Sequence, residues 1–466
     1  MRGTPLPSPA HGAEPGWKVL LALISLSLSL LLWLNGLVDS LTRPSVGEAL
    51  NLRQLELTAL AGELLPAALQ EPMVGKDPRA ELARELQRQI AASALPAPAV
   101  QRLELILLQR GSEPLAKARE LRELTDMVEA PRRPLLQALS EGKRADAAEL
   151  ERWLKPWRAP ALVAQLSCEQ LDAPESSCPA SRWRQRLLLQ LVGVSLVPLL
   201  LLVLGSGLLL RLTWLAWRQR LPAPPPLIGP PLSLVDVTLL VAGGFVVLGE
   251  VILPQLLQAR LAGIVMLLPM DPALAQGVQV LVLYLALMAA PLLILVLMLR
   301  GRGERPSQGW LQWRWRPWRS TAGPAAGLVL MVLPAVSLCG WLIEHFWPDP
   351  GGSNPMLDLV LSSPDPRALA CFALTAIVLA PLFEETLFRG VLLPVIGNRW
   401  GGAAAVLISA AVFALAHLSL SELVPLFVLG TGLGWLRWRS GRLGASVLMH
   451  ALWNSLTFLN LIVLGG

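Results

Sequence analysis

Two adjacent glutamates, Glu384 and Glu385, lie in an apolar stretch that is long enough to cross a lipid bilayer. Arg389 follows four residues after Glu385, and two later apolar stretches each contain a histidine. A charged side chain at the centre of a bilayer costs about 3 kcal/mol on insertion scales, so such groups are usually paired and functional. We therefore expect the chemistry of this protein at this cluster.

The polar side chains of this region belong to three short motifs. These motifs are EETLFR (Glu384 to Arg389), FALAH (Phe413 to His417) and HALWN (His450 to Asn454). Each motif places side chains at positions i and i+4, which share one face of a helix. With the rise of an α-helix, Glu384 and His417 lie about 20 and 24 Å from the nearest turns, and His450 and Asn454 about 12 and 18 Å. These depths are compatible, so the four side chains can meet in one cavity.

The residue types in this cavity suit the activation of water. Arg389 is the natural i,i+4 partner of Glu385, which leaves Glu384 as an unpaired acid. A buried carboxylate beside a histidine can take a proton from water, so we expect Glu384 to act as general base while His417 holds and polarises the water. His450 and Asn454 would then stabilise the tetrahedral oxyanion, and losing one such donor typically reduces the rate by about 10²–10³. This chemistry is amide hydrolysis without a covalent intermediate.

The composition is that of a polytopic membrane protein. The chain has 466 residues, of which 54% are hydrophobic and 15% charged, and its mean hydropathy is +0.54. The net charge of +6 comes from arginines that concentrate in short loops between apolar runs, as cytoplasmic loops require. We expect no nucleic-acid binding, because the basic footprint for it is absent.

The apolar runs predict an all-α membrane helix bundle of about nine spans. The expected spans are 18–39, 187–210, 234–254, 277–299, 323–343, 368–396, 402–418, 423–436 and 443–464. The first span is too long for a signal sequence and lacks a small-x-small cleavage site, so we expect an uncleaved anchor. The sequence thus divides into an anchor (1–41), an extramembrane domain (42–181), spans two to four with basic loops (182–319) and a catalytic membrane core (320–466).

The distribution of charge predicts the orientation in the cell membrane. The loops assigned to the inside contain Arg211, Arg218 and Arg220; Arg300, Arg302, Arg305, Arg314, Arg316 and Arg319; Arg399; and Arg437, Arg439 and Arg442. The loops assigned to the outside contain Glu344, Asp349, Asp358, Asp365 and Glu422. Arg182, Arg184 and Arg186 are the exception. We expect the N-terminus inside and the 42–181 domain and the C-terminus outside.

Residues 42–181 have the pattern of a helical extramembrane domain. Apolar residues recur at helical spacing at Leu82, Leu86 and Ile90, and at Leu121, Leu124 and Val128. Breaks are expected at Pro96, Pro98, Gly111, Pro131 and Pro134. A packed bundle with a solvated outer face explains this pattern most simply, and substrate capture remains an alternative. Outside the cytoplasm, Cys168 and Cys178 could form a disulfide.

Two loops have unusual compositions. Residues 222–231 (PAPPPLIGPP) predict a stiff polyproline connector. Residues 310–319 (WLQWRWRPWR) alternate Trp with Arg, as an interfacial anchor on anionic lipid does, and a ligand-binding role is the alternative. Glu250, near the end of the third span, has no evident partner and is expected to be structural.

The three motifs resemble, in order, the EExxxR, FxxxH and HxxxN signatures of the CPBP family. This family comprises the CAAX prenyl endopeptidases and bacteriocin-processing enzymes, also called Abi-type intramembrane glutamic endopeptidases. The resemblance covers about residues 320–464 and implies a metal-free protease site. It implies that Glu384 and His417 activate water, that His450 and Asn454 bind the oxyanion, and that Glu385 and Arg389 support them. It implies neither a prenylated substrate nor anything about the N-terminal domain.

Three other interpretations remain open from the sequence. The acids could form a buried ion-pair network that only fixes helix packing. Glu384, His417 and His450 could bind zinc in an intramembrane metalloprotease, although the HExxH motif of such enzymes is absent. A GxSxG motif for a serine mechanism is absent too. The chain could instead be a non-catalytic membrane adaptor that uses the 42–181 domain. The expected partners are membrane lipid and a peptide or protein substrate of unknown identity.

Overall fold

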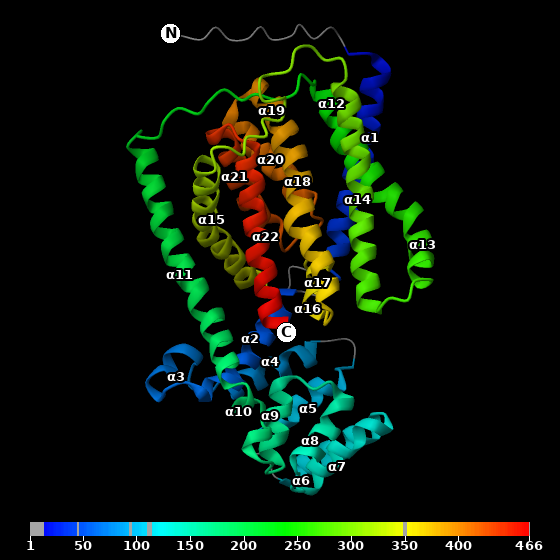
Figure 1. The fold of residues 1–466 in the computed structure, drawn as a ribbon, viewed down its shortest axis with the longest axis vertical. Coiled ribbons are helices and arrows are strands. Elements are labelled where there is room, and N and C mark those ends of the chain that lie inside the picture. The colour runs from blue at the N-terminus through cyan, green and yellow to red at the C-terminus, as the bar shows by residue number, and fades with distance from the viewer. Residues whose placement is uncertain (1–13, 44–45, 93–95, 110–113, 348–351, 466) are drawn as a thin grey trace. The chain divides into compact units, whose positions relative to one another are not determined.

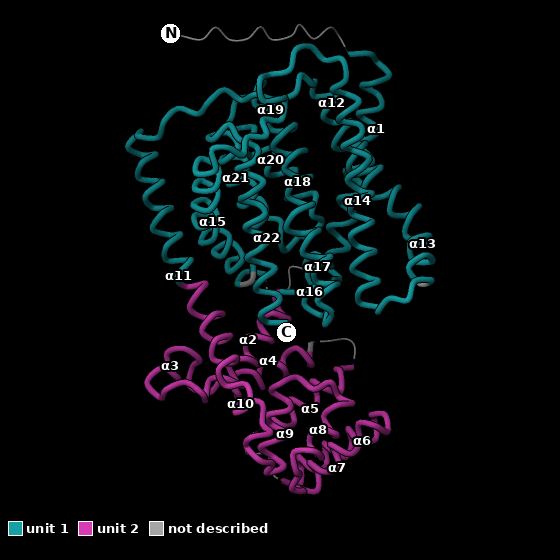
Figure 2. Tube along the Cα trace, in the orientation of Figure 1, with its two compact units in different colours: residues 1–46, 200–466 teal, residues 47–199 magenta. Residues whose placement is uncertain are grey.

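The computed structural model describes residues 14–43, 46–92, 96–109, 114–347 and 352–465, and every regular element in these ranges is a helix. The prediction of an all-α protein is therefore confirmed for this part of the chain, whereas Gly111 and Asp349 lie outside it. Internal contacts divide the chain into two compact units, residues 1–46 with 200–466, and residues 47–199 (Figure 2). We call them the membrane unit and the N-terminal unit.

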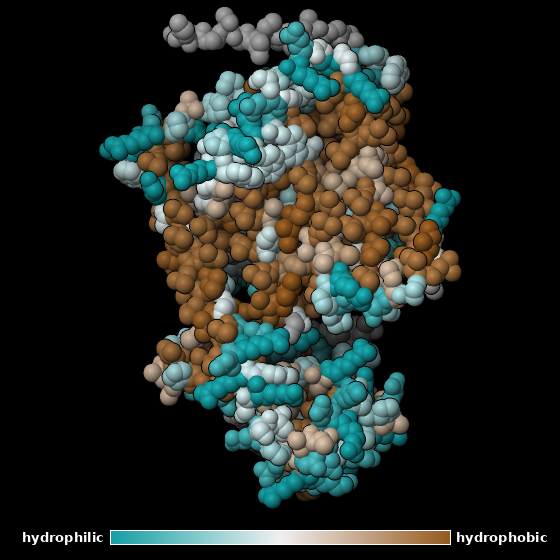
Figure 3. Space-filling view, in the orientation of Figure 1, coloured by the Kyte–Doolittle hydropathy of each residue, from teal (hydrophilic) through white to brown (hydrophobic). Residues whose placement is uncertain are grey.

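The membrane unit contains the long apolar helices, except that the first part of one of them, up to Leu199, belongs to the N-terminal unit. Across the described residues, seven helical stretches are long and apolar enough to cross a membrane. They are α1 (Gly16–Ser40), α11 (Arg184–Trp217), the stretch Leu234–Val265, α14 (Pro272–Leu299), α15 (Arg319–Phe346), the stretch Pro366–Trp400 and α22 (Leu443–Gly465) (Figure 1). In the view of Figure 3, hydrophobic residues cover the middle of this unit. The chain is a multi-pass membrane protein.

Two of the expected spans form helices that are not among these seven. Residues 402–418 contain α20 (Gly402–Leu415), which has 14 residues, and residues 423–436 lie in α21 (Leu423–Ser440), which ends with two arginines in its last turn. The two helices pack closely, because a Cβ atom on Gly430 would lie 3.1 Å from Ala410. Gly430 therefore allows the backbones to approach each other.

Two of the membrane stretches contain π-helical segments. Leu234–Val265 is built from α12 (Leu234–Thr238), η5 (Leu239–Ile252) and most of α13 (Leu253–Met266). Pro366–Trp400 is built from α17 (Pro366–Ala373), η6 (Leu374–Leu379), α18 (Ala380–Glu385), η7 (Thr386–Leu392) and α19 (Leu393–Trp400). The segments η5, η6 and η7 are π-helical, and such segments occur frequently at functional sites. The paired glutamates end α18, directly between two of them.

An aromatic cluster joins the helices around these glutamates. Phe245 of η5 contacts Phe383 and Phe388 edge to face, with ring centroids 5.6 and 6.1 Å apart, and Phe388 contacts Phe413 of α20 at 5.6 Å. All four rings are buried. Each such pair adds about 0.5–1.5 kcal/mol beyond the burial of its area. The cluster thus fixes three elements of the candidate site relative to one another.

The N-terminal unit is a bundle of short helices. They are α2 (Val46–Ala61), η1 (Gly62–Leu64), α3 (Ala67–Val74), α4 (Pro78–Ala92), α5 (Ala99–Leu108), α6 (Pro114–Met127), η2 (Ala130–Arg132), α7 (Arg133–Glu141), α8 (Ala147–Leu154), η3 (Lys155–Trp157), α9 (Ala161–Gln170), η4 (Glu175–Ser177) and α10 (Pro179–Arg182). The predicted helix faces are confirmed, since Leu82, Leu86, Leu121 and Leu124 are all buried.

A disulfide links Cys168 to Cys178 in this unit, with 5.8 Å between their Cα atoms. It connects the last turns of α9 to the start of α10 across the loop that contains η4. The pairing expected from the sequence is therefore confirmed. Cross-linking a short loop stabilises a domain mainly by restricting its unfolded chain.

Candidate active site

Glu385 and Arg389 form a fully buried ion pair. Arg389 Nη1 donates to Glu385 Oε1 over 2.9 Å, and both side chains are 0% exposed. Arg389 Nη2 also donates to the carbonyl oxygen of Gly430 over 3.0 Å, and the guanidinium lies 4.4 Å from the centroid of the Phe413 ring. The i,i+4 ion pair expected from the sequence is confirmed. Helices α21 and α20 supply the further contacts of the guanidinium named here.

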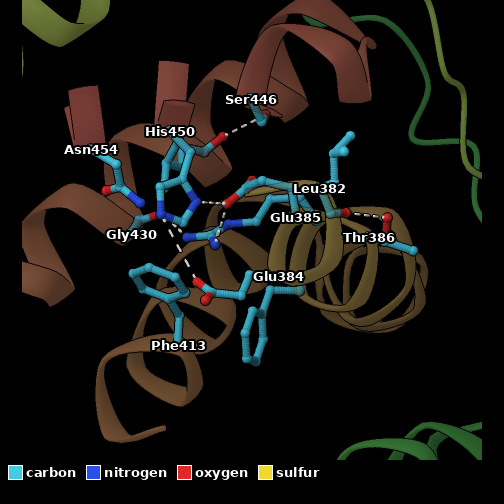
Figure 4. A network of polar contacts seen from close by, with 12 residues as sticks. Leu382, Glu384, Glu385, Thr386, Phe413, Gly430, Ser446, His450 and Asn454 are labelled. Carbon is cyan, nitrogen blue, oxygen red and sulfur yellow. Dashed lines mark hydrogen bonds and ion pairs between the residues drawn. The ribbon is translucent and has the colours of Figure 1, made fainter. Parts of the chain in front are cut away.

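The ring of His450 lies between the two glutamate carboxylates. Its Nδ1 is 3.1 Å from Glu385 Oε1, which is a hydrogen bond, and its Nε2 is 3.9 Å from Glu384 Oε2, which is too long for one (Figure 4). The bond to Glu385 fixes the orientation of the imidazole, so Nε2 faces Glu384. The first and third motifs therefore meet.

Glu384 has a second neighbour that belongs to none of the motifs. Tyr284 of α14 donates its hydroxyl to Glu384 Oε1 over 3.3 Å, whereas Glu384 Oε2 is buried without a hydrogen-bond partner among the described residues. The side chain of Glu384 is 16% exposed. Glu250 of η5 lies within electrostatic range of both Glu384 and Tyr284. One oxygen of Glu384 is thus held, and the other faces His450.

His417 contacts the ring of Phe413, which also contacts His450. Its Nδ1 is 2.8 Å from the carbonyl oxygen of Phe413, and its ring centroid lies 4.6 Å from that of Phe413, which is itself 5.7 Å from His450. Within the described residues, His417 has no hydrogen bond or ion pair with Glu384. It interacts electrostatically with Glu422 in the loop before α21. Burial raises the pKa of Glu422, while the charge of His417 acts in the opposite direction.

Asn454 lies beside His450 on the same helix, α22 (Figure 4). Its Nδ2 donates to the carbonyl oxygen of Ala376 over 2.7 Å. Ala376 belongs to η6, where the π-helical backbone leaves some carbonyl groups without their usual α-helical partners. Asn454 therefore joins α22 to the helix that contains the glutamates.

The residues considered as zinc ligands do not form a ligand set. In the described ranges, no group of three or more His, Cys, Asp or Glu side chains is placed to hold a metal ion. Glu384 and His450 face each other, but among the described residues His417 has no hydrogen bond or ion pair with either of them.

Sequence reasoning missed two contributions to this site. Tyr284 is the only tyrosine of the chain, and it lies in an otherwise aliphatic span, which was a usable signal. The carbonyl group of Gly430 could not have been found, because its role depends on how α21 packs. Glu250, expected to be structural, lies near the same cluster.

Comparison with known proteins relates the part of the chain that contains the three motifs to a family of membrane endopeptidases. Residues 366–456, which contain all three motifs, match the family model described as type II CAAX prenyl endopeptidase Rce1-like. The chain therefore contains an Rce1-like domain, in agreement with the resemblance seen in its motifs. Residues 47–189 match a domain of unknown function, DUF8675, which coincides with most of the N-terminal unit.

A protein of Escherichia coli described as an uncharacterized 24.3 kDa protein is 44% identical to this chain over 85 residues. The match covers 16% of this chain and 38% of that protein, so the chain spans well under half of this relative's length. No solved structure matches the chain. Tyr284 and Glu250 lie outside the Rce1-like match.

Proposed function

We propose that this protein is an intramembrane endopeptidase that hydrolyses a peptide bond of a protein substrate with water activated by Glu384. The observation that carries the proposal is the position of Glu384 Oε2, which has no hydrogen-bond partner in the described part of the chain and lies 3.9 Å from His450 Nε2. A water molecule at hydrogen-bond distance from both atoms fits this separation. Such a water is oriented by two groups that can exchange protons with it.

In the proposed reaction, the oxygen of this water attacks the carbonyl carbon of the substrate and its proton passes to Glu384. The carbonyl oxygen becomes an oxyanion, which His450 and Asn454 stabilise by donating hydrogen bonds. The C–N bond then breaks, and Glu384 gives its proton to the leaving amine. The second proton of the water stays on the new carboxyl group and then passes to the amine. The products are therefore a carboxylate and an ammonium group, and Glu384 regains its starting state.

The neighbours of Glu384 support this assignment. Arg389 compensates the charge of Glu385, and an uncompensated charge in a low dielectric costs several kcal/mol. The bond from His450 Nδ1 to Glu385 leaves the Nε2 atom of His450 facing Glu384, where the reaction is proposed. Glu385 and Arg389 then act by holding His450.

For His417 we retain the role suggested by its motif, which is to help bind the water. Its ring contacts the same phenylalanine as His450, so a movement of the Phe413 side chain would bring it toward Glu384. His417→Ala should therefore lower the rate without changing the Glu385–Arg389–His450 network. If His417→Ala keeps full activity, Glu384 and His450 activate the water by themselves.

Glu384→Gln provides the central test. Cells that produce the native protein, Glu384→Gln or the control Asp358→Asn, a substitution of an exposed acid, are compared by mass spectrometry of new protein N-termini. We expect a set of N-termini that depends on Glu384 and persists in the control. An adaptor would keep its cellular function in Glu384→Gln, and that outcome would reject the protease. Proteins retained by the Glu384→Gln form alone would identify the substrate.

A zinc-dependent reaction is the second candidate to be tested, because Glu384 and His450 are competent ligands. Purified protein is treated with a chelator and then assayed for the Glu384-dependent cleavage. We expect no loss of activity. Activity that disappears with the metal and returns with zinc would replace the metal-free mechanism.

We further propose nine spans, with the N-terminus inside and the 42–181 domain and the C-terminus outside. The close packing of α20 and α21 supports short buried spans, and the Cys168–Cys178 disulfide supports an oxidising compartment for the N-terminal unit. Single cysteines at Ser140 and Arg305 test this topology by labelling intact cells with an impermeant reagent. We expect labelling at position 140 only, and the reverse pattern would overturn the orientation.

A further inference from the structure

Arg314 and Arg437 lie within electrostatic range of each other in the membrane unit, and neither has a carboxylate partner among the described residues. Arg437 belongs to the last turn of α21 and is 0% exposed, and Arg314 is half-buried in the 310–319 loop. Three of their N–H groups, Nε and Nη1 of Arg437 and Nε of Arg314, are buried without a hydrogen-bond partner. The two guanidinium groups are close enough to repel each other.

Backbone from four segments encloses this pair. Arg437 Nη2 donates to the carbonyl oxygen of Ile228 in the proline connector over 2.9 Å. The start of α22 lies against the loop, because Leu443 N donates to the Gln312 carbonyl oxygen over 3.1 Å. A Cβ atom on Gly444 would lie only 3.0 Å from the carbonyl oxygen of Arg314, so glycine allows this approach. The two arginines are therefore held in place by the fold.

No carboxylate of the described residues neutralises these charges. Guanidinium groups stay protonated in proteins, and burying such a charge without a counter-charge costs several kcal/mol. The Ile228 carbonyl group accepts one N–H but has no net charge. The C-terminus of α21 contributes at most about half of a negative charge. An anion from outside the chain would remove the deficit.

We propose that Arg314 and Arg437 form a binding site for a phosphate group. A phosphate presents several oxygens in the geometry that guanidinium groups bind through two N–H donors, so one phosphate can accept from both arginines. The same loop stacks Trp313, Trp315 and Trp318, with ring centroids 6.0 and 5.9 Å apart. Tryptophans favour the headgroup level of a membrane, where phosphodiesters are abundant. The phosphate comes from an anionic phospholipid or from solution.

This site is separate from the proposed proteolysis. Arg314 and the proline connector lie outside the Rce1-like match, and neither arginine contacts Glu384 or His450 in the described structure. The inference thus holds or fails independently of the catalytic assignment.

The test measures the thermal unfolding midpoint of the full chain in micelles of a non-ionic detergent that contains no phosphate. One arm adds inorganic phosphate at constant ionic strength, with chloride as the control salt, and a second arm adds phosphatidylglycerol. The variants are Arg437→Met, Arg314→Gln and the control Arg305→Gln, an exposed arginine in the same region of the chain. We expect the midpoint of the native protein to rise in at least one arm. Losing a charged hydrogen-bond donor should weaken the affinity roughly tenfold or more.

The direction in which the unfolding midpoint changes distinguishes a phosphate site from a purely structural role of the two arginines. Without phosphate or phosphatidylglycerol, Arg437→Met should unfold at the same or a higher temperature than the native protein, because it removes an uncompensated charge. If only inorganic phosphate raises the midpoint, the site binds soluble phosphate. If only phosphatidylglycerol raises it, the site binds the lipid headgroup. A native protein that responds to neither, or an Arg437→Met form that keeps the full response, would overturn the site. If Arg437→Met does not fold, the half-buried Arg314→Gln variant provides the same comparison.

Discussion

Both units of this protein bury glutamates, but they surround them differently. In the N-terminal unit, Glu104 of α5 is 1% exposed and has one oxygen without a partner, and its charged neighbours are Glu56 and Arg53. In the membrane unit, Glu385 is equally buried but contacts both Arg389 and His450. Burial alone therefore does not mark a reactive acid. An acid can take part in chemistry when cations and a second titratable group converge on it in a fixed geometry.

The largest expected effect is on the rate of cleavage, which should depend on Glu384 of the membrane unit and not on Glu104 of the N-terminal unit. Glu384→Gln should lower the rate of Glu384-dependent cleavage by about 10²–10⁴, the usual contribution of a general base. Glu104→Gln should leave the cleavage rate unchanged. The variants are compared by cleavage in membranes, and the fold of Glu384→Gln is checked by its unfolding midpoint. Equal rates in the native protein and Glu384→Gln would remove the difference between the two regions.

The next effect concerns stability in the membrane unit. Glu385→Gln leaves the buried guanidinium of Arg389 without its carboxylate, which should destabilise the protein by about 3–5 kcal/mol. Replacing both partners, as in Glu385→Gln with Arg389→Met, should recover much of this loss, because no uncompensated charge remains. Thermal unfolding of the full chain measures both. If the double variant is no more stable than Glu385→Gln alone, the ion pair does not dominate this region.

These contrasts also show what the sequence could predict. Long apolar runs are visible at any position, so seven of the nine expected spans coincide with long apolar helices. The spacing of Glu385 and Arg389 is a local property, and their ion pair followed from it. Whether α20 and α21 cross the membrane is harder to decide from length and composition. Short helices that are buried in a bundle need less apolar length than helices that face lipid.

The remaining features of the site depend on tertiary packing. His450 contacts Glu385 rather than Glu384 directly, and only the rotation of α22 against α18 determines which carboxylate it meets. The π-helical segments around Glu384 change the register of the helix, and residue types do not report that change. The depth calculation showed that the four polar groups could meet. It could not show that the Nδ1 of His417 contacts the carbonyl oxygen of Phe413 instead of Glu384.

A smaller effect tests the acid of the N-terminal unit. Burial raises the pKa of Glu104 to about 8, and the charge of Glu56 adds to this rise. The folded state therefore binds a proton that the unfolded state has already released between about pH 4.5 and 8, so stability falls as the pH rises through this window. The loss should reach a few kcal/mol, at about 1.4 kcal/mol per pKa unit.

Glu104→Gln should abolish this dependence and make the N-terminal unit more stable than the native form above pH 8. Hydrogen exchange of the α5 amide groups in the full chain, corrected for the intrinsic effect of pH, provides the measurement. Glu120→Gln replaces an exposed acid of the same unit and should behave like the native protein. An unchanged pH dependence in Glu104→Gln would show that the buried acid is compensated by other groups.

The smallest effect concerns Tyr284, which holds one oxygen of Glu384 from outside the family match. Tyr284→Phe removes a single hydrogen bond while keeping the ring that contacts Phe383 edge to face. A hydrogen bond to a charged group contributes about 1.5–3 kcal/mol, and the 3.3 Å length of this bond places it at the lower end, so the rate should fall roughly tenfold. Because Tyr284 positions the base and does not bind substrate in our proposal, kcat should fall while KM stays constant. Leu285→Ala changes the neighbouring exposed residue on the same helix and should affect neither constant. A rise in KM with constant kcat would instead place Tyr284 among the groups that bind substrate, and Glu384 would then be oriented by His450 and its own helix.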